Sequence, residues 1–155
     1  MYVTGFIAPL LFTLFTMQTS KVFIWEPFGL SCSSTLPLTE TQNAESWELE
    51  DDPFYFWLEA ERIPVSDYDA GWINGGAKLT ALKVAEEGGY VNVQDGGPIP
   101  NVPAGHFVTS FEEGMTTYII IIIDLKSNVV YEIYLDDELE RKPYIYQILN
   151  SLRFI

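Results

Sequence analysis

An unbroken apolar run at 118–123, which contains five consecutive isoleucines, constrains the fold more than any other part of the sequence. Successive side chains of a β-strand point to opposite faces, so a strand without a polar position has no face that suits water. Isoleucine also favours strands, because its branched side chain packs well on a pleated surface. The run therefore predicts a strand within a sheet that is covered on both sides.

The segments around this run predict the other strands. Residues 129–135 follow a turn at 124–128 and predict a hairpin partner for the run. Further strands are expected at 28–38, 46–50, 54–63, 90–94 and 107–111. The segment 95–105 is rich in proline and glycine, which predicts an irregular connection.

Two segments show the spacing of amphipathic helices. Residues 67–87 end at Gly88-Gly89, a pair typical of a helix C-terminus, and the helical pattern is clear from Ala77 onward. A closing helix begins near Pro143, and its apolar residues recur at i, i+3, i+4 and i+7: Ile145, Ile148, Leu149 and Leu152. The sequence predicts a single α+β domain over about 25–155. Its predicted architecture is a three-layer α/β/α sandwich with a central, mainly antiparallel sheet of about six to seven strands.

Composition and charge exclude several classes of protein. The chain has 155 residues, 8 Lys and Arg against 22 Asp and Glu, and a formal net charge of −14. Binding to nucleic acid depends on clustered cations, so a nucleic-acid partner is not expected. A single Cys and a single His exclude an internal disulfide framework and a zinc ribbon, and the sequence predicts no cofactor.

The first 20 residues carry no charged side chain, and their apolar run at 6–15 has the length of a signal-peptide core. We interpret 1–20 as a signal peptide, which predicts an exported, periplasmic or secreted protein. The alternative is a misassigned leader, with a cytoplasmic chain that starts at Met17. Pro9 interrupts the run and Lys21 follows it, so no membrane span is expected.

The chain resembles the PsbP-like family, the fold of the photosystem II extrinsic protein and of a yeast Ran-binding import factor. The matching features are the entry WEPFGL at 25–30, Pro37 after the first strand, the aromatic segment 54–58 followed by a helix, and the closing segment 145–154. The resemblance implies a PsbP-like sandwich and a family of mainly non-enzymatic accessory and partner-binding domains. It assigns a functional role to no residue of this chain.

Clusters of acidic residues are the first candidate site. The candidate partner face contains Glu48, Glu50, Asp51, Asp52, Asp136, Asp137 and Glu138. Such clusters keep a surface solvated, and they also suit a basic protein partner. Tyr55, Trp57, Trp72, Tyr131 and Tyr134 are candidates for an aromatic groove or for core packing, of which core packing is favoured.

A second candidate site is the connection 95–105, where Asp95, Asn101 and His106 are candidate ligand-binding residues. This segment supports the alternative function, a small-ligand or divalent-cation-binding protein that uses the loop and nearby acids. Asp67 and Asp69 begin like a calcium loop, but the position that needs a glutamate is lysine, so helix capping is the favoured interpretation.

The catalytic motifs G-x-S-x-G and H-E-x-x-H are absent from the sequence, and Cys32 and His106 are the only candidates for a thiolate–imidazole pair. The sequence therefore favours a non-enzymatic, exported accessory domain that binds a protein partner.

Overall fold

The computed structural model describes residues 19–53 and 55–155, so most of the expected leader 1–20 lies outside the described residues. Within these ranges the helical elements are η1 (Val65–Asp67), α1 (Ala70–Asn74), α2 (Gly76–Glu87) and α3 (Lys142–Ser151). The strands are β1 (Lys21–Trp25), β2 (Leu30–Ser34), β3 (Thr39–Gln42), β4 (Ser46–Glu50), β5 (Phe56–Pro64), β6 (Gln94–Pro98), β7 (Gly105–Glu112), β8 (Met115–Asp124), β9 (Val129–Asp137) and β10 (Arg153–Phe154). None of the helices in the described part has the length and apolar character that a membrane crossing requires.

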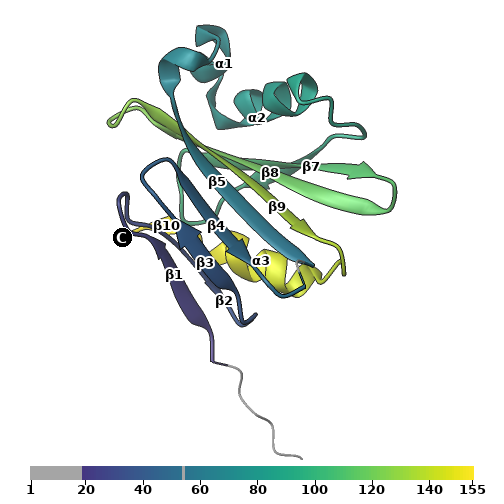
Figure 1. Ribbon diagram of the computed structural model, residues 1–155. Coiled ribbons are helices and arrows are strands. Elements are labelled where there is room, and N and C mark those ends of the chain that lie inside the picture. The colour runs from purple at the N-terminus through teal and green to yellow at the C-terminus, as the bar shows by residue number, and fades with distance from the viewer. Residues whose placement is uncertain (1–18, 54) are drawn as a thin grey trace, which may run out of the picture.

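Seven strands form one antiparallel sheet in the order β3-β4-β5-β9-β8-β7-β6 (Figure 1). The expected α+β class and the expected antiparallel sheet of six to seven strands are confirmed. The isoleucine run lies in β8, which has β9 on one side and β7 on the other.

The isoleucines of β8 divide between two separate cores. Ile119, Ile121 and Ile123 face α2, where they pack with a cluster that includes Ala81, Val84 and Ala85. Tyr118, Ile120 and Ile122 belong to the other cluster, to which α3 contributes Ile145, Ile148 and Leu149. Figure 1 shows α1 and α2 on one side of the large sheet and α3 on the other. The two-sided burial predicted from the isoleucine run is therefore observed.

A small second sheet, β1-β2-β10, was not predicted. β1 precedes the expected domain start at residue 25, yet its Phe23 and Trp25 are fully buried. The Trp25 ring lies 6.3 Å from that of Trp47 and 5.9 Å from that of Tyr131, between ring centroids. β10 extends the chain beyond α3 and pairs with β2, so the closing helix is shorter than expected. Both predicted start points, Met17 and the end of the leader near residue 20, leave β1 in the folded chain.

Two predicted strands are placed differently by the structure. The strand expected at 28–38 is reduced to β2, because Gly29 adopts φ +63° in the turn before it. The strand expected at 90–94 is wrong, since β6 runs over Gln94–Pro98, inside the segment expected to be irregular. Gly96 lets β6 approach Phe107 of β7, where a Cβ atom would lie 2.1 Å from the phenylalanine ring.

Replacing Trp25 by alanine tests whether β1 belongs to the folded domain. We expect Trp25→Ala to lower the free energy of unfolding by about 3–5 kcal/mol, because it leaves a cavity beside Trp47 and Tyr131. Val22→Ala on the same strand, at a half-exposed position, is the matched control and is expected to change it by about 0.5 kcal/mol or less. Urea unfolding followed by circular dichroism measures both. Equal small effects would show that β1 contributes nothing to the core.

Candidate functional site

Two acids of the predicted partner face lie in the interior and not on the surface. Asp51 is 8% exposed and Asp137 is 2% exposed. The Arg141 side chain joins them, with Nη2 3.0 Å from Asp51 Oδ2 and Nε 3.0 Å from Asp137 Oδ2. The backbone amides of Phe56 and Leu139 donate to the remaining carboxylate oxygens at 2.7 and 3.1 Å. This buried ion cluster fixes the ends of β4 and β9, and the assignment of Asp51 and Asp137 to a partner face is corrected.

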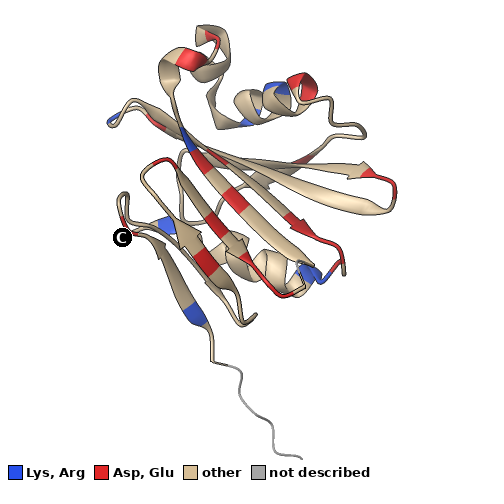
Figure 2. Cartoon of the chain, in the orientation of Figure 1, with Lys and Arg blue, Asp and Glu red and all other residues tan. Residues whose placement is uncertain are grey.

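The accessible acids of these strands lie on one face of the large sheet, which we name the carboxylate face. Side chains alternate along each strand, so the face collects every second residue of β4, β5 and β9. Figure 2 shows acidic positions along these neighbouring strands. The acids of the carboxylate face are Glu48 and Glu50 on β4, Glu59 and Glu61 on β5, and Glu132 and Asp136 on β9.

Like charges oppose each other directly across this face. Glu48 pairs in register with Glu59, and Glu61 pairs with Glu132. Burial, Glu61 and Glu48 together raise the pKa of Glu59 above its ordinary value. Directly opposed like charges destabilise an antiparallel pair, so this arrangement weakens the sheet that carries it.

Two tyrosines hold the carboxylate of Glu132. Tyr68 Oη donates to Glu132 Oε1 at 2.5 Å, and Tyr134 Oη donates to Glu132 Oε2 at 2.8 Å. Burial and the nearby glutamate raise the pKa of both tyrosines, so both hydroxyls stay protonated and remain donors. Glu132 is therefore fixed in place at the border between the carboxylate face and the helical layer.

An apolar hollow adjoins the carboxylate face at the end of β5. Trp57 is 38% exposed and Tyr55 is 40% exposed, although core packing was the favoured interpretation of both. Tyr131, by contrast, is buried as expected. The hollow has a volume of about 280 Å³ and is lined by Glu50, Tyr55, Trp57, Met115, Asp136 and Glu138. Tyr55, Trp57 and Met115 form its apolar part, and the three acids form its rim.

Asp136 stands in the wall of this hollow. Burial raises its pKa, a hydrogen bond from Thr117 opposes that rise, and Glu138 adds to it. Its Oδ1 atom is shielded from solvent and has no hydrogen-bond partner among the described residues. The last member of the predicted partner face, Asp52, is exposed in the turn after β4.

The predicted ligand loop does not converge on one point. His106 Nε2 lies 2.6 Å from Asp95 Oδ1, and Lys78 of α2 binds the other oxygen of Asp95. Lys78 and then His106 lower the pKa of Asp95 to about 2. Asn101 points elsewhere, donating to the carbonyl of Asn150 at the end of α3 at 2.5 Å. In the described residues, no three acidic, histidine or cysteine side chains are grouped as a metal ion would require.

The remaining candidate residues cap a helix, lie in a core or form a hydrogen bond with a neighbouring side chain. Asp69 Oδ1 accepts from the Gly71 amide at 2.7 Å at the start of α1, so the capping interpretation is confirmed for Asp69. Cys32 is buried on β2, and burial raises the pKa of its thiol. His106 is bound to Asp95 and lies opposite Ile121, whose side chain is in the α2-side core, whereas Cys32 belongs to the α3-side core, so the two do not form a thiolate–imidazole pair.

Sequence reasoning missed Glu59, Glu61 and Glu132 as members of the site. The signal was present in the alternation Glu59-Ala60-Glu61, because acids on both sides of a buried alanine indicate one wet face of a strand. Comparison with known proteins assigns no relative: no protein-family model matches this chain, and no similar curated protein or solved structure is found.

The buried ion cluster predicts a large loss of stability when its cation is removed. We expect Arg141→Met to lower the free energy of unfolding by about 3–5 kcal/mol, because two buried carboxylates lose their partner. Lys142→Met, one residue further along and exposed, is the control and is expected to change it by about 0.5 kcal/mol or less. Urea unfolding at neutral pH compares the two. A loss below 1 kcal/mol for Arg141→Met would contradict the role given to the cluster.

The carboxylate face predicts the opposite result at Glu59. Glu59→Gln is expected to raise the free energy of unfolding at pH 7 by roughly 0.2–1 kcal/mol, because it removes a charge opposed to Glu48. A raised folded-state pKa means that the folded chain binds the proton more tightly, so wild-type stability falls as pH rises above the ordinary value of 4.5. The gain from Glu59→Gln is therefore full at neutral pH and disappears as pH falls below that value.

Glu86→Gln is the matched control for net charge, because Glu86 is exposed on α2 and paired with Lys83. It removes the same charge and is expected to give no stabilisation. Equal gains for the two variants would show that total charge, and not the opposed pair, sets the effect.

Proposed function

We propose that this chain is a non-enzymatic, exported accessory domain that binds a basic protein partner. The contact surface is the carboxylate face together with the apolar hollow beside Trp57. The observation that supports it most strongly is the direct opposition of Glu48 to Glu59 and of Glu61 to Glu132 on a sheet face that the described helices leave open. Lysine and arginine side chains of a partner would relieve this repulsion on binding.

The open face follows from how the helices are distributed. α2 packs against β6, β7 and β8, at one side of the large sheet. The strands β3, β4 and β5 lie at the other side, and Figure 1 shows no helix over their outer face. A basic partner bound there would contact carboxylates from β4, β5 and β9 at the same time.

The apolar hollow supplies the non-polar part of the same contact. Surface charges steer association and set its salt dependence, whereas buried aromatic side chains provide most of the affinity at protein interfaces. Trp57 and Tyr55 are aromatic, exposed and adjacent to Glu50 and Asp136. The combination of an aromatic centre with an acidic rim favours a protein over a small ion as the partner.

The fold is proposed to be a PsbP-like α/β/α sandwich, as the resemblance in the sequence implies. Two observations support the layered arrangement: α2 and α3 lie in different cores, and β8 contributes isoleucines to both. Accessory roles are the general property of that family, and export is the proposed location.

The experiment that tests the function is capture of the partner, followed by its titration. The tagged protein is cross-linked in its native cells and purified from separate fractions, and a companion recovered reproducibly is then produced and titrated against variants. We expect Glu48→Gln combined with Glu59→Gln to weaken binding about tenfold, and affinity to fall as salt rises. We expect Trp57→Ala to weaken binding by a similar factor.

The matched control combines Glu86→Gln with Glu87→Gln, which removes two charges from the end of α2. It is expected to leave the affinity within a factor of two. A companion that binds all these variants equally, or whose affinity ignores salt, would refute the carboxylate face as the contact surface.

A further inference from the structure

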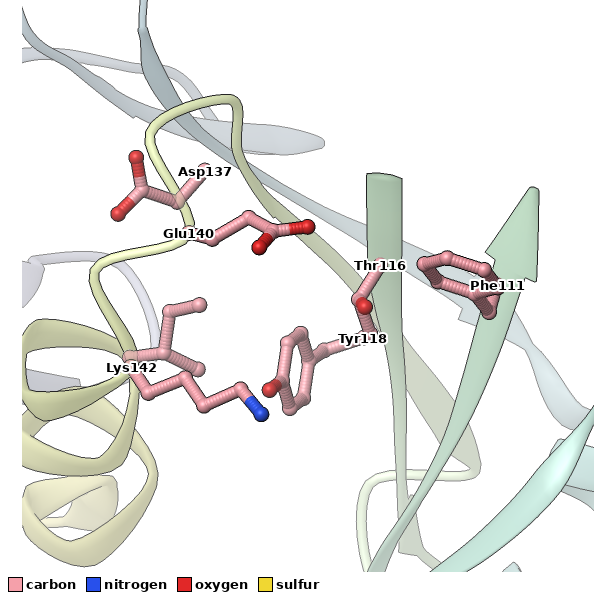
Figure 3. Close-up of a pocket in the computed structure, with 7 residues that line it drawn as sticks. Phe111, Thr116, Tyr118, Asp137, Glu140 and Lys142 are labelled. Carbon is pink, nitrogen blue, oxygen red and sulfur yellow. The ribbon is translucent and has the colours of Figure 1, made fainter. Parts of the chain in front are cut away.

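We propose that a cavity between the β7–β8 hairpin and the start of α3 binds a small zwitterion of the α-amino-acid type. The cavity has a volume of about 240 Å³ and lies on the face of the sheet opposite to the carboxylate face. Figure 3 shows its labelled lining residues: Phe111, Thr116, Tyr118, Asp137, Glu140 and Lys142.

The cavity presents one charge of each sign, and the two are held apart. Glu140 and Lys142 both line it, and neither forms an ion pair with any residue in the described ranges. In Figure 3 the Glu140 carboxylate points toward Thr116, whereas the Lys142 ammonium points toward Tyr118. A ligand with a carboxylate and an ammonium group can satisfy both walls at once, whereas a simple anion or cation satisfies one of them.

The backbone that carries these two charges is fixed. The Glu140 amide donates to the Asp137 carbonyl at 2.9 Å, and the Arg141 amide donates to the Asp137 carboxylate at 2.9 Å. The Lys142 amide in turn donates to the Glu140 carbonyl at 2.9 Å. A site whose walls are already in place loses less conformational entropy when a ligand binds.

Tyr118 adds a hydroxyl donor to the wall that carries Lys142. The residue as a whole is only 3% exposed, and its ring lines the cavity. Burial, Tyr146 and Glu140 raise its pKa, so the hydroxyl remains a donor. The solvent-shielded side-chain atoms without a partner in the described ranges are Arg62 Nε and Asp136 Oδ1, so the Tyr118 hydroxyl is open to the solvent of the cavity. A ligand carboxylate bound there would accept from Tyr118 and Lys142 together.

Asp137 does not disturb this balance of charge. Arg141 neutralises its carboxylate, which points away from the cavity in Figure 3. Phe111, which is 50% exposed, forms an apolar wall that the side chain of a bound amino acid would cover. The volume is below the range of about 300–1,000 Å³ that is usual for drug-sized ligands, which restricts the occupant to a small molecule.

The experiment is an NMR titration of the folded chain with three matched probes. L-phenylalanine carries both charges, 3-phenylpropanoate carries only the carboxylate, and 2-phenylethylamine carries only the ammonium group. We expect L-phenylalanine to shift the amide signals of Thr116 and Tyr118 with saturation, and each single-charge probe to bind at least about tenfold more weakly. Lys142→Met and Glu140→Gln are each expected to weaken L-phenylalanine about tenfold.

Lys126→Met in the β8–β9 turn and Glu87→Gln at the end of α2 are the controls, and each is expected to leave the affinity unchanged. All four substituted positions are exposed, so the variants are expected to keep the wild-type thermal stability. If the shifts caused by L-phenylalanine do not saturate at concentrations up to about 10 mM, the proposal is overturned. Binding of a single-charge probe as tight as that of L-phenylalanine, or equal binding by all variants, would overturn it too.

Discussion

Burial of β8 on both faces is the constraint on which the rest of the structure depends. Five consecutive isoleucines give the strand no side for water, so each face of the sheet needs its own cover at that point. α2 supplies the cover on one face, and α3 with the small β1-β2-β10 sheet supplies it on the other. Because the chain is short, this cover is concentrated over the strands that require it.

The size of the elements explains why an open surface remains. Seven strands about 4.8 Å apart make a sheet about 29 Å wide, whereas α2 makes its main contacts with β6, β7 and β8 alone among the strands. The helical layer therefore leaves β3, β4 and β5 uncovered on one face, and the alternating acids of β4 and β5 occupy that face. The opposed glutamates weaken the sheet, so stability does not explain their presence.

Strand alternation also decides how much of the site could be predicted. The limits of β4, the two-sided burial of the isoleucine run and the apolar face of α3 followed from residue patterns alone. The acid clusters did not, because neighbours in sequence point to opposite faces: Glu50 is accessible and Asp51 is buried, and Asp136 and Asp137 differ in the same way. Because the acids were grouped by adjacency in the sequence, the predicted partner face combined members of the buried ion cluster with members of the carboxylate face. The sequence analysis missed β1, β3, β6 and β10, because these short segments become strands only through pairing with a neighbouring strand.

Site-specific photo-cross-linking in native cells tests whether a protein partner binds the carboxylate face. A photoreactive residue replaces Glu61 on the carboxylate face in one variant and Leu125, in the exposed β8–β9 turn, in another. We expect one reproducible protein adduct from position 61, with a basic surface on the captured partner, and none from position 125. No adduct from position 61, or the same adduct from both positions, would contradict this expectation.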